Sequence, residues 1–227
     1  MSIFRTLDVR CPACDTPVSF ELVYSVAADR RPDLRDAILD GSFQRMACPS
    51  CATSIRAEPE FSYMDIARGQ YIGVWPVQKR EEWREYAGRT QQVFDEMLGA
   101  GATAEAQEIG NKLEPRAVFG WAALVEKILA RQAGIDDRTL EVAKAAVMRT
   151  LETMPLPGVQ EFRLLRLEGD DPVFGWVRTA DGTASGAVRV PRKLVADIDG
   201  DAPTWQALRD SVGEGLLVDF QREMLTA

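Results

Sequence analysis

Four cysteines, arranged as two copies of one tetrapeptide, constrain this chain more than any other feature. The sequence reads Cys-Pro-Ala-Cys at 11–14 and Cys-Pro-Ser-Cys at 48–51, and these are the only 4 cysteines among 227 residues. In each copy the proline fixes its own φ at about −65° and favours a tight turn that can place both thiols on one side. Two such turns supply the four sulfur ligands that Zn²⁺ prefers in closed structural sites. We therefore predict one structural zinc ion bound by Cys11, Cys14, Cys48 and Cys51.

Other interpretations of the cysteines compete with zinc. A disulfide within each tetrapeptide would close a small, strained ring, and a reducing cytosol disfavours it. A thioredoxin-like redox motif needs a helix after the first cysteine, whereas strand-like sequence follows both copies. Iron in the same four-sulfur shell stays open, because rubredoxin-type sites also use paired tetrapeptides. Four thiolates saturate the ion and leave no position for substrate, so we expect a structural and not a catalytic metal.

The composition narrows the classes of function. Histidine is absent, which removes the Ser-His-Asp and Cys-His mechanisms and the commonest general base near neutral pH. The formal net charge is −8, and each third of the chain carries more acidic than basic residues. Nucleic-acid binding usually needs a positive patch, so this balance weighs against it. We expect a protein that is not an enzyme, since no recognisable set of catalytic residues groups together.

The first 78 residues alternate between apolar and polar side chains, as half-buried strands do. A short helix is predicted over 32–41, with Leu34, Ala37 and Ile38 facing inward. We expect residues 1–78 to form a zinc-ribbon-like antiparallel β part with this helix as an insertion, which accounts for the long spacing between the two tetrapeptides. The predicted strands cover residues 3–9, 18–24, 43–47, 53–58, 61–63 and 71–75.

From Lys79 the apolar residues recur at helical spacing, and residues 79–154 are predicted as a three-helix segment. The helices are expected over 79–98, from Pro115 to Gly134, and from Asp136 to Leu151. The predicted inward residues are Trp83, Tyr86, Ala87, Thr90, Phe94, Met97 and Leu98 in the first, Val118, Ala122, Val125, Ile128 and Leu129 in the second, and Leu140, Ala143, Val147 and Leu151 in the third.

The run Met-Pro-Leu-Pro-Gly at 154–158 interrupts every pattern and is the predicted domain boundary. Residues 159–227 then form a small C-terminal α+β unit. Its predicted strands cover 162–167, 173–179 and 187–190, and its predicted helices cover 191–197 and 204–212, with a final amphipathic turn set at Leu216, Leu217, Phe220 and Met224.

Three further groups admit a functional and an ordinary structural interpretation. Asp136, Asp137 and Glu141 could bind a divalent ion, but a helix cap explains them more simply. The acidic runs at 170–172 and 197–201 lack the twelve-residue calcium-loop pattern and are interpreted as turns. The aromatic residues are interpreted as core residues, in preference to a stacking platform for bases. The basic run 190–194 is interpreted as the solvated start of a helix. The aromatic residues are Trp83, Tyr86, Trp121, Trp176 and Trp205.

Six ordered motifs resemble the CpXC domain family, named for its Cys-Pro-x-Cys tetrapeptide. Besides the two tetrapeptides they are LRDAILDGSF at 34–43, FSYMDIARGQYIGVWP at 61–76, AVFGWAALVEKI at 117–128 and GIDDRTLEVAK at 134–144. One departure is that Asp15 and Ala52 follow the tetrapeptides where the family often has glycine. The resemblance covers roughly residues 1–150 and implies a zinc-ribbon-like N-terminal part; it supplies no activity.

Taken together, these features predict a zinc-binding protein in which the metal stabilises a module that binds another protein. The alternative is a nucleic-acid-binding zinc ribbon that uses Arg10, Arg45 and Arg56 near the tetrapeptides. No stretch approaches the ~18 consecutive apolar residues of a spanning helix. The N-terminus lacks the apolar core of a signal peptide, so a cytoplasmic location is expected.

Overall fold

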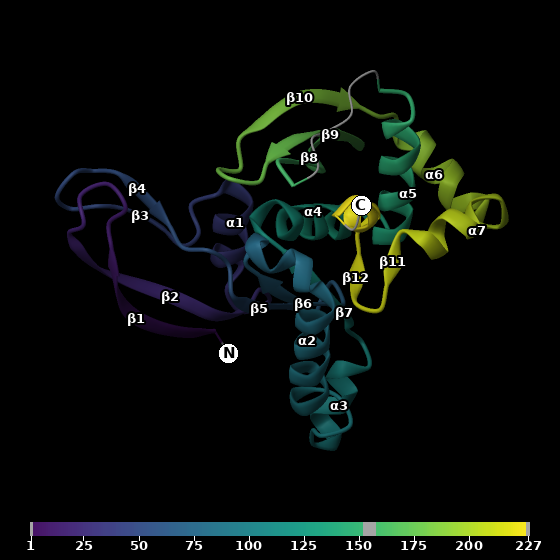
Figure 1. Cartoon of the computed structure of the whole chain (residues 1–227). Helices are drawn as coiled ribbons and strands as arrows, with labels where there is room; N and C mark the ends of the chain where they lie inside the picture. The colour runs from purple at the N-terminus through teal and green to yellow at the C-terminus, as the bar shows by residue number, and fades with distance from the viewer. Residues whose placement is uncertain (1, 152–157, 226–227) are drawn as a thin grey trace.

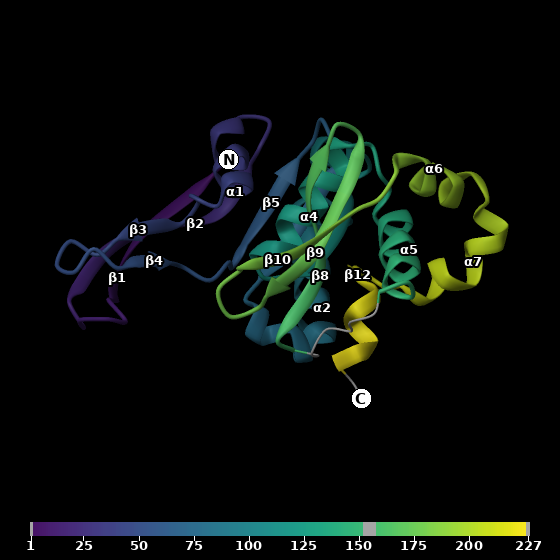
Figure 2. The same cartoon turned by 90° about the horizontal axis from the view of Figure 1, so that it is seen from above.

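The computed structural model describes residues 2–151 and 158–225, and it confirms the α+β class. A five-stranded sheet and a three-stranded sheet carry the fold, with helices packed against both (Figures 1 and 2). Within the described residues, no helix has both the length and the apolar content needed to cross a membrane.

The larger sheet is mixed, which corrects the antiparallel arrangement predicted for residues 1–78. Its strand order is β1-β2-β5-β6-β7. The β1/β2 and β5/β6 pairs are antiparallel, whereas β2/β5 and β6/β7 are parallel. Parallel neighbours need a crossover connection, and local alternation does not reveal which strands a crossover will join. The strands are β1 (Ile3–Arg10), β2 (Pro17–Ala27), β5 (Phe61–Asp65), β6 (Gln70–Trp75) and β7 (Glu114–Phe119).

The crossover from β2 to β5 contains α1 (Pro32–Asp40) and a second hairpin, β3 (Arg45–Ala47) and β4 (Ser54–Arg56). The predicted helix is confirmed, with Ile38 buried and Gly41 ending it in the left-handed region at φ 80°. Both hairpins extend from the body of the molecule in the same direction, which Figures 1 and 2 show from two sides. We call these hairpins, residues 3–24 and 45–56, the arm.

The crossover from β6 to β7 differs from the prediction for residues 79–134. It contains a 3₁₀ turn, η1 (Val77–Glu82), followed by α2 (Trp83–Met97) and α3 (Ala104–Gly110). The segment after Pro115 is strand β7, and α4 (Trp121–Gln132) begins only after Gly120. A helix from Pro115 was therefore wrong at its start, and α3 was missed because seven residues give too short a periodic signal.

Strands β5, β6 and β7 are covered on both faces. Val74 and Val118 face α1 and α4, whereas Tyr71 and Phe119, at the alternate positions, face α2. The inward face predicted for α2 is confirmed except at Met97, which is exposed.

Helix α4 lies between the two sheets and is buried on almost every side (Figure 1). The predicted inward set is confirmed only in part: Val118 and Ile128 are buried, whereas Ala122, Val125 and Leu129 are half-buried. Ala123 and Leu124, outside the predicted stripe, are buried as well. Helix α5 (Asp137–Met148) follows the prediction more closely. Its predicted residues Leu140, Ala143 and Val147 are buried, and Leu151 is half-buried.

The strands and helices predicted after residue 158 are confirmed. The smaller sheet has the order β10-β9-β8, and α6 and α7 follow it. The predicted boundary at 154–158 falls almost wholly outside the described residues, and the division into domains stays a prediction. The elements are β8 (Gln160–Glu168), β9 (Asp171–Arg178), β10 (Ala184–Arg189), α6 (Arg192–Gly200), α7 (Ala202–Ser211), β11 (Gly213–Glu214), β12 (Leu217–Val218) and η2 (Phe220–Leu225).

Residues on both sides of that boundary share one apolar core. Leu140 and Val147 of α5 belong to the same cluster as Phe162 of β8, Phe174 of β9 and Ile198 of α6. Helix α5 therefore shares its apolar core with the smaller sheet.

A network of buried charges joins the same elements. The Arg163 guanidinium bonds to Glu126 at 2.9 Å, to Glu161 at 2.8 Å and to Asp219 at 2.8 Å. Lys144 lies 2.8 Å from Glu126. These side chains come from α4, α5, β8 and the segment before η2, and all are nearly inaccessible to solvent.

The titration behaviour of the network follows from its pairing. Burial alone would raise the pKa of Asp219, but the charges of Arg163 and Arg80 hold it far below its usual range. Burial raises the pKa of Glu141, which shares Lys144 with a second carboxylate, Glu126. The charged form of most of these groups thus depends on a partner from another element.

Arg163→Met should lower the free energy of unfolding by about 3–5 kcal/mol, because it leaves three carboxylates without their shared cation. Arg166→Met is the matched control on the same strand. Arg166 is exposed and, among the described residues, pairs only with Glu168, so its loss should cost less than about 1 kcal/mol. Urea unfolding followed by circular dichroism measures both. Equal losses in the two variants would contradict a network that depends on Arg163.

Candidate metal centre

Two turns with the same backbone geometry carry the cysteines. The first joins β1 to β2: the Cys11 N–H donates to the Thr16 carbonyl at 3.0 Å, and the Asp15 N–H donates to the Cys11 carbonyl at 2.9 Å. The second turn joins β3 to β4 and repeats both bonds. There the N–H groups of Cys48 and Ala52 donate to the carbonyls of Thr53 and Cys48 at 2.8 and 2.9 Å.

The residue after each tetrapeptide has a left-handed backbone. Asp15 has φ 57° and Ala52 has φ 59°, a region in which only glycine avoids a steric cost. The departure from glycine therefore strains the backbone of each turn, while the cysteines themselves are retained.

The turns bring all four sulfurs into one cluster. Cys11 Sγ lies 3.6 Å from Cys51 Sγ, and Cys14 Sγ lies 3.7 Å from Cys48 Sγ. All four sulfurs lie within 4.8 Å of one another, and none forms a disulfide. In a regular tetrahedron with Zn–S bonds of about 2.3 Å, sulfurs are about 3.8 Å apart. The cluster therefore has the size and the donor set of a four-thiolate metal site.

Threonine hydroxyls act on the two exposed thiols. Cys14 Sγ and Cys51 Sγ each lie 3.2 Å from the hydroxyl oxygen of the threonine two residues later, Thr16 or Thr53. Hydrogen bonds from that hydroxyl and from the same residue's backbone N–H lower the pKa of Cys14 to about 6, and the pKa of Cys51 is lowered for the same reason. Thiolates are the form that binds metal, so the two threonines favour ligation by Cys14 and Cys51. At Cys11 the backbone hydrogen bond of Ala13 lowers the pKa, but burial and the side-chain hydrogen bonds of Cys14 and Cys48 outweigh it and raise the pKa to about 11.

Apart from the cysteines, little holds the ends of the two hairpins together. Cys11 and Cys48 are buried with Val18, and only Val9, Met46 and Ile55 pack partly against them. A cluster this small buries too little apolar surface to fix two hairpins without a further link.

The acidic residues weighed as metal ligands have structural roles. Asp136 caps α5 by accepting the Thr139 N–H at 2.8 Å. Asp137 pairs with Arg116 at 2.6 Å, and Glu141 pairs with Lys144 at 3.0 Å. Among the described residues, the four cysteines are the one cluster of such side chains close enough to share an ion.

Asp171 and Asp199, one from each of the acidic runs at 170–172 and 197–201, form ion pairs with arginines. Asp171 lies 2.7 Å from Arg189 and accepts the Arg192 N–H at 2.7 Å. Asp199 lies 3.3 Å from Arg209 and is part of α6, which extends to Gly200, so the interpretation of 197–201 as a turn was wrong.

The three arginines suggested for nucleic acid are only partly brought together. Arg10 pairs with Asp15 across the first cysteine turn at 2.8 Å. Arg45 and Arg56 lie directly opposite each other in the β3/β4 register. Among the aromatic residues, Trp83 and Tyr86 are buried, whereas Trp121, Trp176 and Trp205 are half-buried.

Sequence reasoning missed the buried charges around Arg163. One signal was available: Glu161 and Arg163 alternate with apolar residues on a predicted strand, and Glu141 and Lys144 are three apart on a predicted helix. Such pairs are usually exposed, so the pattern alone does not indicate burial.

An α+β protein with one four-thiolate cluster at the end of a two-hairpin arm is the class that this fold and site define. The family model described as CpXC protein matches residues 9–144, which include both tetrapeptides and the chain through most of α5. The chain belongs to the CpXC family. A search of curated proteins found no match, and a search of solved structures found none.

Ala52→Gly should raise the free energy of unfolding by up to about 1 kcal/mol, because glycine removes the left-handed strain at φ 59°. Ala47→Gly, in strand β3 of the same hairpin, should lower it by about 0.5–1 kcal/mol. Chemical unfolding of both variants in the metal-loaded protein measures the difference. A loss of stability in Ala52→Gly would show that the turn is not strained.

Proposed function

We propose that the tetracysteine cluster holds a structural Zn²⁺ ion, and that the stabilised arm is a zinc-ribbon-like module that binds another protein. The sulfur separations of 3.6 and 3.7 Å support zinc, being close to those of a tetrahedral four-sulfur shell. Iron fits the same donors, and elemental analysis distinguishes the two.

The proposed metal has no catalytic role. Four thiolates complete its coordination, so neither water nor substrate has a position on the ion. Because the unfolded chain has no preformed site, the free energy of zinc binding adds to the folding stability of the arm. We likewise propose that the protein is not an enzyme and that it works in the cytosol, where the thiols stay reduced.

Strand β1 is the observation that carries the interaction proposal. It is an edge strand of the larger sheet, and none of its eight residues is buried. Ile3, Phe4 and Leu7 expose 49%, 36% and 42% of their surface, respectively. A long, exposed apolar edge usually has a covering partner, because its free N–H and C=O groups pair with another strand.

We propose that the partner is a protein that adds an extended segment to β1. Backbone hydrogen bonds would give affinity in this mode, and pockets for alternate side chains would give specificity. The metal contributes by holding the ends of the two hairpins together, so that β1 stays extended and does not fray.

One equivalent of zinc per chain is the first expected result, and Cys48→Ser should lower zinc content, solubility and melting temperature. The serine hydroxyl is a poor zinc ligand, and an incomplete shell no longer links the hairpins. Inductively coupled plasma analysis and thermal unfolding measure the two effects.

Ser50→Ala is the matched control, since Ser50 lies in the same turn, is exposed and is not a ligand. It should retain both zinc and melting temperature. Purified parent protein with well under one equivalent of zinc or iron, or with disulfides at both tetrapeptides, would contradict the metal assignment. A Cys48→Ser variant as stable as the parent would contradict the structural role.

Leu7→Lys should abolish capture of a protein partner from the native cell, because a lysine on an edge strand blocks strand addition. The parent chain, carrying an affinity tag at the C-terminus and treated with nuclease, should retain the partner. Mass spectrometry of the captured material identifies the protein that is lost in the variant.

Met97→Lys is the control, because Met97 exposes 57% of its surface on α2, outside the arm. It should capture the partner as the parent does. If nuclease treatment removes the captured protein, or if the parent binds nucleic acid below micromolar concentration at ~150 mM salt in a mobility-shift assay, the nucleic-acid alternative replaces this proposal.

A further inference from the structure

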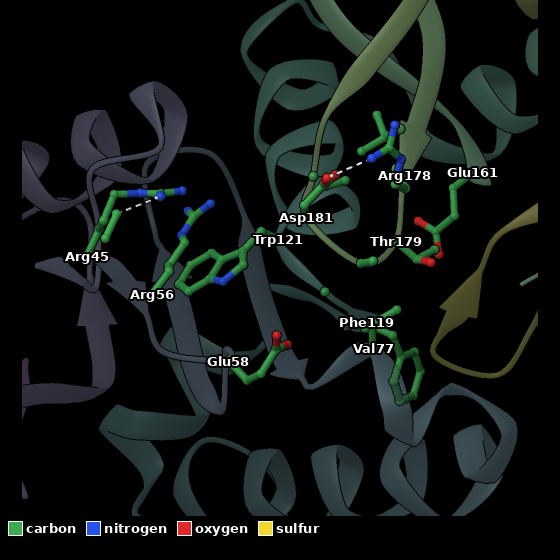
Figure 3. Close-up of a pocket in the computed structure, with 16 residues that line it drawn as sticks. Arg45, Arg56, Glu58, Val77, Phe119, Trp121, Glu161, Arg178, Thr179 and Asp181 are labelled. Atoms are coloured by element: carbon green, nitrogen blue, oxygen red, sulfur yellow. Dashed lines mark hydrogen bonds and ion pairs between the residues drawn. The ribbon is translucent and has the colours of Figure 1, made fainter. Parts of the chain in front are cut away.

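A pocket of about 300 Å³ separates the base of the arm from the smaller sheet. Figure 3 shows Arg45, Arg56 and Trp121 on one side, and Arg178, Thr179 and Asp181 on the other. A pocket of this size can hold a small molecule. No residue of the tetracysteine cluster lines it.

Two arginines in this pocket lack carboxylate partners. Arg45 and Arg56 oppose each other directly in the β3/β4 register, and like charges in such a pair destabilise a sheet. Among the described residues, neither forms an ion pair within 4.0 Å of an acidic side chain, although the charges of Glu58 and Asp40 act on Arg56 from farther away. Arg178, for comparison, lies 3.0 Å from Asp181.

Arg56 is also incompletely hydrogen-bonded. Its guanidinium stacks on Trp121 with Cζ 4.1 Å from the ring centroid, and its Nε lies 3.4 Å from the Phe43 carbonyl. Its Nη2 is buried and has no hydrogen-bond partner. Burial, together with the charge of Arg45, lowers the pKa of Arg56 to about 10. A buried guanidinium nitrogen without an acceptor is costly. The Arg56 side chain as a whole is only half-buried and lines the pocket, so an oxyanion there would pair with its charge.

Arg45 is held in place beside it. Its Nε donates to the Gly41 carbonyl at 3.1 Å and its Nη1 to the Ser54 hydroxyl at 3.1 Å. Both acceptors are neutral, so the arginine charge is oriented and not neutralised. The two guanidinium groups are thus positioned before any ligand arrives.

The N-terminus of α4 adds to the same field. Gly120, Trp121 and Ala122 line the pocket, and the helix has no side-chain cap and no acidic residue in its first turn. The first N–H groups of a helix lack intrahelical acceptors and favour an anion.

Acidic residues offset this charge only in part. Glu58, exposed at the pocket rim, and Asp40, the last residue of α1, both act on Arg56 through their charges. Glu161 is committed to Arg80 and Arg163. Asp181 is committed to Arg178.

We propose that this pocket binds a small molecule through a phosphate group, with Arg45 and Arg56 as the cations that hold it. Two arginines and a helix N-terminus match a dianionic phosphate better than a single carboxylate. The pocket is concave and the chain is acidic overall, which favours a small ligand over a nucleic-acid strand. The inference does not depend on the metal or on the protein partner.

The test is isothermal titration calorimetry of the full chain, as isolated, with inorganic phosphate, adenosine monophosphate, acetate and succinate. Phosphate and the phosphate monoester should bind, and the carboxylates should bind at least about tenfold more weakly. Arg56→Gln and Arg45→Gln should each weaken phosphate binding at least about tenfold, because each removes a charged donor.

Arg30→Gln is the matched control: it makes the same change in net charge at an exposed residue that does not line the pocket. It should leave phosphate binding unchanged. A thermal-shift series at constant ionic strength is the second readout, in which phosphate should raise the melting temperature of the parent and of Arg30→Gln but not that of Arg56→Gln.

Three results would overturn the proposal. The first is no binding of phosphate or the monoester up to about 10 mM, and the second is equal weakening by Arg30→Gln and Arg56→Gln, which would indicate only a general charge effect. The third is tighter binding of succinate than of phosphate, which would assign the pocket to carboxylates. Loss of zinc or of the protein partner has no bearing on any of these readouts.

Discussion

The Arg163 side chain is 2% exposed and meets carboxylates from α4, β8 and the segment before η2. An unpaired buried charge costs several kcal/mol, so each of these carboxylates requires the element that supplies its partner. Glu126 lies within residues 9–144, the part matched by the family model, whereas Arg163 and Asp219 lie beyond it. The matched region therefore completes its polar core with residues from outside the match, and the C-terminal segment is a structural requirement of this chain.

The tetracysteine cluster lies at a different place, at the end of the arm. The arm leaves the body beyond the short β2/β5 pairing of Ser25–Ala27, and its end carries only a small apolar cluster. Figure 1 shows the arm on one side of α4, and α5 and β12 on the other. Body and arm thus differ in what holds them together: the body contains buried ion pairs, whereas the end of the arm has four clustered cysteines and a small apolar cluster. Loss of the metal that we propose there should therefore affect the arm first.

Sequence patterns anticipated those parts of the fold that depend on neighbouring residues. The two cysteine turns, α1, the β5/β6 hairpin and the three strands of the smaller sheet all follow from local alternation and turn residues. Local patterns did not predict the parallel pairing of β6 with β7 or the burial of α4 on nearly all sides, because both depend on elements distant in sequence. The spacing of the cysteines indicated which side chains meet. The cysteine spacing did not indicate that Arg45 lies opposite Arg56, or that Arg56 stacks on Trp121.

The cysteine cluster and the arginine pair lie at opposite ends of one short ladder. Strands β3 and β4 share only three residue pairs, from Ala47 opposite Ser54 next to the cysteine turn, to Arg45 opposite Arg56 at the base. A slip of one residue in such a hairpin would turn every side chain to the other face, and three pairs specify register weakly. The main-chain bonds of the cysteine turn fix that register at one end, because the Cys48 N–H donates to the Thr53 carbonyl and the Ala52 N–H donates to the Cys48 carbonyl. The backbone geometry of the turn therefore also determines which face of the hairpin presents the two arginines, and the charge of the pocket follows from it.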